Sequence, residues 1–111
     1  MAAQIGGYLS ETEHRAFKQY AASLGVSESS LASLIVLREL HQQRMLELIP
    51  RFQGRVPAQE RKRITAHQRD PEPKAAFDAW CNVAGIPPDQ GATILFRAEL
   101  DERWLLSCVG G

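Results

Sequence analysis

The chain has no long apolar run, and this shortage narrows the class of protein. Its longest unbroken apolar stretch is residues 34–37, far below the roughly 20 residues that a membrane-spanning helix needs. The first residues lack the basic stretch and the apolar segment of a signal peptide. We therefore expect a cytoplasmic protein that does not associate with a membrane.

Cysteine is also scarce, and the usual patterns of catalytic and metal sites are missing. Cys81 and Cys108 lack CxxC spacing and a neighbouring cluster of ligands, so reduced thiols are expected rather than a disulfide or a metal site. The three histidines share no metal-binding spacing with the carboxylates. No Ser-His-Asp arrangement or glycine-rich phosphate loop stands out either. We expect no enzymatic activity, no metal and no cofactor.

An excess of charge of either sign is absent as well, because 13 basic residues balance 13 acidic ones. A neutral chain is not expected to bind polyanions over its whole surface, but a local basic face remains open. Between residues 51 and 69, six basic residues accompany a single acid, Glu60. The six are Arg51, Arg55, Arg61, Lys62, Arg63 and Arg69. A charge run is usually a solvated face, so its neighbours decide whether it binds phosphate.

What the chain does contain is a repeat. A shift of sixty residues aligns the two halves, and the shared residues span two helical patterns. Matching pairs include Phe17/Phe77, Tyr20/Trp80, Gly25/Gly85, Glu39/Glu99 and Leu40/Leu100. Two copies are too few for a solenoid. At 111 residues, we expect one domain, residues 1–111, in which two small units bury their apolar faces against each other.

The first copy, residues 1–49, is expected to form two helices after a short extended segment. Apolar residues recur at helical spacing from Ala16 to Leu24, Gly25 ends that helix and Ser27 caps the next. The second helix either ends near Leu40 or continues until Pro50 stops it. Its expected buried residues are Leu31, Leu34, Ile35, Leu37 and Leu40, followed in the longer version by Met45 and Ile49.

The second copy, residues 61–108, repeats the plan after an exposed linker at residues 50–60, which is rich in proline and glycine. Its first helix follows Asp70-Pro71 and ends at Gly85, with apolar residues Ala75, Ala76, Phe77, Trp80 and Val83. Pro87-Pro88 opens its second helix. The expected inward residues of that helix are Ala92, Leu95, Phe96, Leu100 and Trp104.

The segment ahead of the first helix in each copy alternates its side chains as a strand does. In the second copy, Ile64 and Ala66 share one face with Gln68. Allowing for one extra residue in that copy, the opposite face presents Arg63, Thr65 and His67, which match Gln4, Gly6 and Tyr8 of the first copy. Neither strand has a partner within its own copy, so we expect residues 4–9 and 63–68 to pair as an antiparallel ribbon.

A strand, a helix, a Gly-x-Ser turn and a second helix resemble the ribbon–helix–helix DNA-binding family of Arc, MetJ and CopG. The resemblance is carried by Lys62-Arg63-Ile64-Thr65-Ala66-His67, by Leu9-Ser10-Glu11-Thr12-Glu13 and by Gly25-Val26-Ser27. It implies a mostly α fold with a short antiparallel β-ribbon, built from two fused βαα units as an intramolecular pseudo-dimer. The first copy also looks like accessory DNA-binding proteins of plasmid mobilisation and conjugative relaxosomes.

The resemblance further implies that the ribbon enters the major groove of double-stranded DNA. The expected base-reading residues are Gln4, Gly6, Tyr8, Arg63, Thr65 and His67. Expected phosphate contacts are Arg61 and Lys62, with Ser27, Ser29 and Ser30 at a helix N-terminus. We expect Tyr8 and Arg63 to act on different halves of the DNA site. The last helix should anchor phosphate less well, because Pro87 and Pro88 lack donors and Asp89 is acidic.

Two functions from different classes stay open. The first is sequence-specific DNA binding, either in plasmid conjugation with a relaxase or another relaxosome protein as partner, or as a small transcriptional repressor. In this function the protein is a monomeric pseudo-dimer, and its self-association on DNA is left open. The second is an assembly module of the same fold that binds a protein and has lost DNA binding. Neutral net charge and Gly6-Gly7, which weakens a strand, favour the second function, whereas Arg63-Ile64-Thr65 and the basic linker favour the first. An antitoxin function is less favoured.

Overall fold

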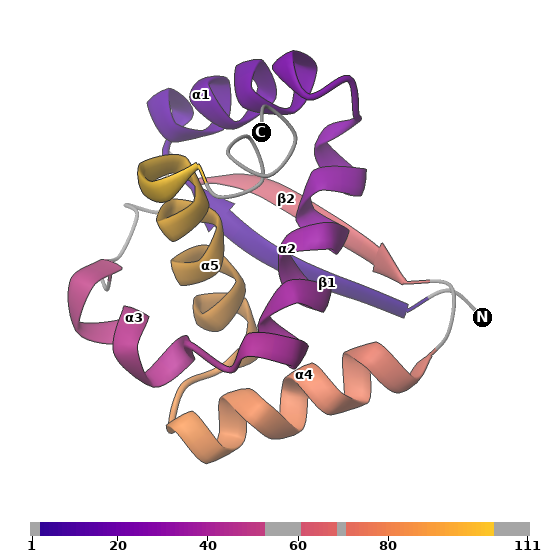
Figure 1. The fold of residues 1–111 in the computed structure, drawn as a ribbon, viewed down its shortest axis with the longest axis vertical. Helices are drawn as coiled ribbons and strands as arrows, with labels where there is room; N and C mark the ends of the chain where they lie inside the picture. Colours follow the sequence, from indigo (N-terminus) through magenta and orange to yellow (C-terminus); the bar gives the residue numbers. More distant parts are fainter. Residues whose placement is uncertain (1–2, 53–60, 69–70, 104–111) are drawn as a thin grey trace.

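The computed structural model describes residues 3–52, 61–68 and 71–103 of the 111-residue chain. The elements are β1 (Ala3–Leu9), α1 (Glu11–Ser23), α2 (Glu28–Gln42), α3 (Met45–Phe52), β2 (Lys62–Gln68), α4 (Pro71–Ala84) and α5 (Pro88–Glu102). The fold is mostly helical and contains one short two-stranded antiparallel sheet (Figure 1). This coarse architecture agrees with the sequence prediction.

The two strands pair over their whole length. Gly6 lies opposite Thr65 at the centre, Tyr8 opposite Arg63 towards one end and Gln4 opposite His67 towards the other. The predicted pairing of residues 4–9 with residues 63–68 is therefore confirmed. Each strand satisfies the backbone hydrogen-bonding groups of the other, which neither could do alone.

The helices cover one face of this ribbon. α5 packs against β1 and α2 packs against β2, so each strand lies against a helix from the other half of the chain (Figure 1). The inward-facing side chains Ile5, Leu9, Ile64 and Ala66 are buried. Gly7 is buried with them, and the alternate residues are exposed or partly exposed, namely Gln4, Gly6, Tyr8, Arg63, Thr65 and His67. The alternation expected of a half-buried ribbon is therefore present in both strands.

Close contact between α5 and β1 depends on Gly7. A Cβ atom at this position would lie 2.6 Å from Phe96 Cε2 and 3.0 Å from the Thr93 backbone nitrogen. The Tyr8 backbone N–H donates a hydrogen bond to the Thr93 hydroxyl at 2.8 Å beside it. Gly7 was expected to weaken the strand, but its missing side chain is what lets the helix approach.

The first and last turns of the helices follow the sequence signals. Ser10 caps α1 in a capping box with Glu13, and Ser27 caps α2. Gly25 and Gly85 follow α1 and α4 with φ of 75° and 79°. Left-handed backbone of this kind is readily accessible to glycine, which explains why both copies keep it.

The second helix of the first copy is shorter than its longer predicted version. α2 ends at Gln42, Gln43 adopts a left-handed conformation, and the separate helix α3 follows. The break is stabilised because the Met45 N–H donates to the buried Glu39 carboxylate at 2.7 Å. Pro50 lies inside α3 and does not start the linker. The rest of the predicted linker, residues 53–60, lies outside the described residues.

Several residues predicted to face the core are instead exposed. In α2, Leu34 is 45% exposed and Leu37 is 37% exposed. In α4, Val83 is 71% exposed and Ala75 and Ala76 are exposed too. The stripe that α2 buries against β2, α5, α4 and α1 does not include Leu34 and Leu37. The buried residues of α2 are Leu31, Ala32, Ile35, Val36 and Glu39. Trp104 and Cys108 lie outside the described residues.

One hydrophobic core joins the two halves. Phe17 and Phe77, which occupy equivalent places in the repeat, are both fully buried. The ring centroids of Phe17 and Phe96 lie 5.3 Å apart, so the first and second halves pack directly on each other. Among the described residues, no single helix is long and apolar enough to cross a membrane, and α1 with α2 passes that test only as a pair bent by 89°.

A buried carboxylate from each half accepts a hydrogen bond from an aromatic side chain of the other half. Glu99 accepts from the Tyr20 hydroxyl and from Arg38. Glu39 accepts from the Trp80 indole N–H at 2.8 Å. Buried carboxylates are costly without partners. These donors therefore make the two acids compatible with the core.

Candidate nucleic-acid interface

The six predicted base-reading positions lie together on the ribbon face that the helices leave uncovered. Gln4, Arg63 and His67 are exposed, whereas Gly6, Tyr8 and Thr65 are partly exposed. All are held by the antiparallel register of two paired strands and not by loops. The face is therefore a fixed platform on which side chains from both halves of the chain alternate.

One end of the ribbon is strongly basic. Arg61, Lys62 and Arg63 are consecutive, and all three are exposed at the start of β2. The Arg61 guanidinium carbon lies 5.8 Å from the centroid of the Tyr8 ring, a distance at which a cation and an aromatic face attract. Strand alternation places Arg61 and Arg63 on the face of Tyr8, whereas Lys62 has the parity of the inward residues and is exposed at the same end of β2. We call Tyr8 and these three cations the basic end.

Arg63 extends over the centre of the ribbon. A Cβ atom at Gly6 would lie 2.7 Å from Arg63 Nε and 2.8 Å from one terminal nitrogen. Gly6 therefore leaves the space in which the guanidinium rests. Gly6 was predicted as a base-reading position, but it has no side chain with which to contact a base edge. Its effect on the face is exerted through Arg63.

The register corrects the prediction that Tyr8 and Arg63 act on different halves of a DNA site. The two residues are directly opposite in the ribbon, so they belong to the same end. Tyr8 corresponds in the repeat to His67, and the other end holds His67 opposite Gln4. In an antiparallel ribbon built from two repeat copies, residues that are equivalent in the two copies lie at opposite ends. Away from the centre, residues directly opposite each other therefore come from non-equivalent positions of the repeat.

The serines at the start of α2 divide into two groups. Ser27 accepts the N–H of Ser30 at 3.1 Å, and both residues are exposed. Ser29 instead donates its hydroxyl to the Thr65 carbonyl at 2.8 Å, and Ser33 donates to the His67 carbonyl at 2.9 Å. Ser29 therefore fixes α2 to β2, a role different from the predicted phosphate contact. Sequence reasoning missed Ser33.

The start of α5 lacks the cap that α2 has. Pro87 occupies the N-cap position without a side-chain cap hydrogen bond, and the acidic Asp89 lies exposed in the first turn. One turn later, the Thr93 hydroxyl accepts a hydrogen bond from the Tyr8 N–H and donates one to the Asp89 carbonyl at 2.9 Å. Ser33 and Thr93 are sixty residues apart and therefore occupy equivalent positions in the repeat. The repeat alignment could have indicated that both hydroxyls form hydrogen bonds with a strand.

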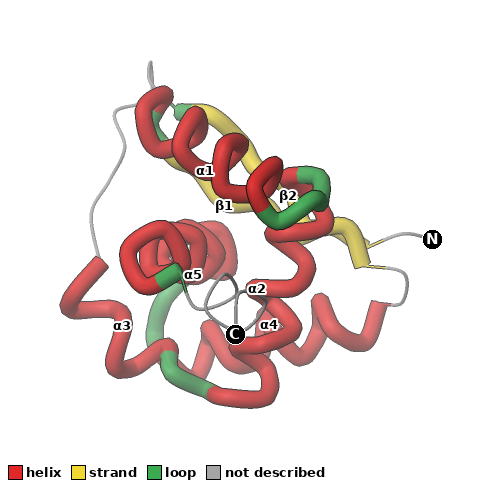
Figure 2. The backbone as a smooth tube through the Cα atoms, turned by 45° about the horizontal axis from the view of Figure 1, so that its top comes forward, coloured by secondary structure: helices red, strands yellow, loops and turns green. Residues whose placement is uncertain are grey.

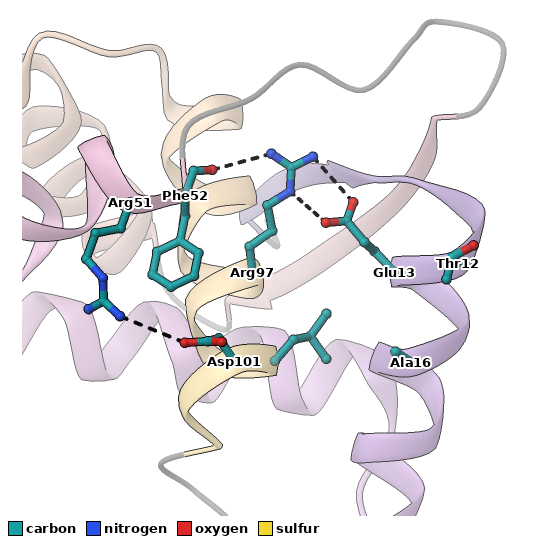
Figure 3. A pocket seen from close by; sticks show the side chains of 8 residues that line it. Thr12, Glu13, Ala16, Arg51, Phe52, Arg97 and Asp101 are labelled. Carbon is teal, nitrogen blue, oxygen red and sulfur yellow. Dashed lines mark hydrogen bonds and ion pairs between the residues drawn. The ribbon is translucent and has the colours of Figure 1, made fainter.

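A surface hollow lies between α1, α3 and α5, away from the ribbon face (Figure 3). Arg97 donates to Glu13 at 2.9 Å and to the Phe52 carbonyl at 3.4 Å, and Arg51 lies 3.8 Å from Asp101. Burial raises the pKa of Glu13, but hydrogen bonds from the Ser10 N–H and from Arg97 outweigh it and hold that pKa below its ordinary value. These paired charges join three helices.

Cys81 is a buried residue of α4. Burial, with the nearby charges of Asp78, Glu39 and Asp89, raises the pKa of its thiol to about 12. The thiol therefore remains protonated at neutral pH and is a poor nucleophile. Within residues 3–52, 61–68 and 71–103, no three His, Cys, Asp or Glu side chains come together as metal ligands.

Comparisons with protein-family models, with curated proteins and with solved structures gave no match.

Proposed function

We propose that the chain is a tandem ribbon–helix–helix protein that binds double-stranded DNA through the outer face of its ribbon. The order βαα occurs twice, with α3 between the copies. Each copy contributes one strand to the ribbon and one helix that packs on the strand of the other copy. This exchange supports an intramolecular pseudo-dimer, because neither copy has a complete core or a paired strand by itself.

The uncovered ribbon face is the observation that carries the proposal. A two-stranded ribbon fits the major groove of B-DNA, where base edges present distinct donor and acceptor patterns. Arg63 has the guanidinium suited to a guanine edge, and Gln4 has the amide suited to adenine. Thr65 and His67 add shorter polar groups, and both point from the same face.

Phosphate contacts are assigned to residues beside this face. Arg61 and Lys62 stand at the basic end, and Ser27 and Ser30 are exposed at the start of α2. Helix N-termini and lysine or arginine side chains are common phosphate partners, and they position a protein without selecting a base sequence. The proposed activity is binding without catalysis, either as a conjugation accessory factor or as a small repressor in the cytoplasm.

The test is a fluorescence-anisotropy titration of the full chain with labelled duplexes of random and of selected sequence. Between roughly 50 and 200 mM salt, the dissociation constant should rise steeply. Lys62→Ala should weaken all duplexes alike and reduce the slope of log affinity against log salt by about 1. Arg63→Ala should cost about 1–3 kcal/mol on the selected duplex and relax one base position.

Arg51→Ala is the matched control, because it removes the same charge from α3. In Figure 1 and in Figure 2, α5 lies between α3 and the two-stranded ribbon. Arg51 forms ion pairs with Asp101 and Glu102. This variant should bind DNA as the wild type does. If no duplex binds in a salt-sensitive way, or if Arg51→Ala and Lys62→Ala weaken binding equally, the ribbon is not the DNA-binding surface.

The exposed Leu34 and Leu37 favour a second function, binding of a protein partner. They lie one turn apart on α2 and present apolar surface to solvent. A relaxase or another relaxosome protein is the partner class that the family resemblance suggests. Leu34→Gln with Leu37→Gln should leave DNA affinity unchanged and abolish co-purification with such a partner. Protein capture without any DNA affinity would favour the assembly module.

A further inference from the structure

We propose that the ribbon recognises a non-palindromic DNA site in one fixed orientation, because its two ends differ in chemistry. The proposal rests on the function proposed above and concerns the kind of duplex that the same face selects. It is carried by the strand register and by the identity of the residues at each end.

The centre of the ribbon defines which residues are equivalent. Gly6 lies opposite Thr65, and the two strands align in the repeat with an offset of 59 residues. With that offset Gln4 is the counterpart of Arg63, and Tyr8 is the counterpart of His67. The pair of Tyr8 and Arg63 at the basic end thus corresponds to the pair of His67 and Gln4 at the other end.

In a ribbon made from two identical chains, corresponding pairs would be identical, and a palindromic site would match them. Here the basic end presents a guanidinium and a phenol, with Arg61 over the Tyr8 ring and Lys62 exposed at the same end of β2. The other end presents an amide and an imidazole. None of the described residues at this end is lysine or arginine; they are Ala3, Gln4, Ile5, Ala66, His67 and Gln68.

Neighbouring charges preserve this difference. Glu11 opens α1 beyond the basic end, but it lies 3.7 Å from Arg15, with which it forms an ion pair. Arg69 and Asp70 follow β2 in the sequence with opposite charges and lie outside the described residues. Counted along the sequence, Arg61, Lys62 and Arg63 at the basic end outnumber the two nearby acids, Glu11 and Glu60, and Glu60 lies outside the described residues.

These chemistries select different bases. Arginine pairs with the O6 and N7 atoms of guanine, and glutamine pairs with the N6 and N7 atoms of adenine. The half of the site facing Arg63 should contain a guanine at the position where the other half contains an adenine. The basic end should also hold more phosphate contacts, which fixes the direction in which the protein lies on the duplex.

The experiment selects duplexes from a random library with the full-length wild type, with Arg63→Gln and with Gln4→Arg. The wild type should select an asymmetric motif. Arg63→Gln should change the preferred base in one half only, and Gln4→Arg should change it in the other half, towards a palindrome. Both residues are exposed, so thermal melts of the variants should overlay that of the wild type.

A direct titration completes the test. On a palindrome built from two copies of the half that faces Arg63, the wild type should bind roughly 5- to 150-fold more weakly than on its selected site. Gln4→Arg should recover that loss. Salt-sensitive binding with a palindromic wild-type motif, or a change in both halves or in neither with Arg63→Gln, would overturn this inference and leave the proposed function standing. Absence of salt-sensitive binding would overturn both.

Discussion

The Tyr20 hydroxyl of α1 donates a hydrogen bond to the buried carboxylate of Glu99 in α5. The same relationship recurs sixty residues on with the halves exchanged, because the Trp80 indole N–H donates to Glu39. Both bonds connect the first helix of one copy to the second helix of the other. Each buried acid thus gains its aromatic donor only when the two copies come together.

Removal of the Tyr20 hydroxyl should destabilise the fold. Tyr20→Phe leaves the ring but takes one donor from the buried Glu99 carboxylate, a loss that costs about 1–3 kcal/mol. The midpoint of urea denaturation measures it. Tyr8→Phe removes a hydroxyl from the open ribbon face and should change stability by less than about 0.5 kcal/mol. Equal midpoints for the two variants would contradict a structural role for the bond.

The aromatic pair of the repeat should be equally important to the core. Phe17→Ala and Phe77→Ala each remove a fully buried ring, so each should lower the free energy of unfolding by roughly 3–5 kcal/mol. Val83→Ala, on an exposed part of α4, should stay within about 0.5 kcal/mol of the wild type. Wild-type denaturation curves for both phenylalanine variants would show that the repeat alignment does not identify the core.

Adjacent glycines should respond differently to the same substitution. Gly7→Ala places a Cβ atom against Phe96 and the α5 backbone, so we expect a loss of about 1–3 kcal/mol from overpacking. Gly6→Ala meets only the flexible end of Arg63 and should change stability by less than about 0.5 kcal/mol. Thermal melts distinguish them. A larger loss of stability for Gly6→Ala than for Gly7→Ala would contradict the packing of α5 against the side of β1 on which Gly7 lies.

Acid should weaken the fold partly through Glu13. Its folded pKa lies below its ordinary value of 4.5, with burial opposed by hydrogen bonds from Ser10 and Arg97. The stabilising contribution is therefore complete above the unfolded pKa and is lost as the pH falls through the lower folded pKa. Glu13→Gln should flatten the fall in denaturation midpoint between roughly pH 5 and pH 3. Parallel curves for variant and wild type would exclude this contribution.

Local signals and the repeat predicted much of the fold. Gly25, Gly85 and Ser27 mark helix boundaries because their conformational preferences act within a few residues. The ribbon could be predicted because each copy has one strand without a partner of its own, so the two strands were expected to pair with each other. The site positions then followed from side-chain alternation, which explains why all six lie on one face.

The remaining features depend on how whole elements pack, and sequence spacing does not contain that information. Leu34 and Leu37 have core-like spacing, yet α2 presents another stripe to the ribbon and α5. Burial of Glu39 and Glu99 could have been suspected from their identity in the repeat, but their aromatic donors come from the other copy. Likewise, Tyr8 and Arg63 became neighbours only through the strand register.

Because both strands of the ribbon belong to one chain, its formation is a unimolecular event. Two subunits that share a ribbon separate on dilution, and their folded fraction then depends on protein concentration. In this chain the second strand is always present at an effective concentration set by the covalent connection. The outer face of the ribbon therefore stays complete at any dilution. A single substitution alters one end of this face, whereas a homodimer would carry the change at both ends.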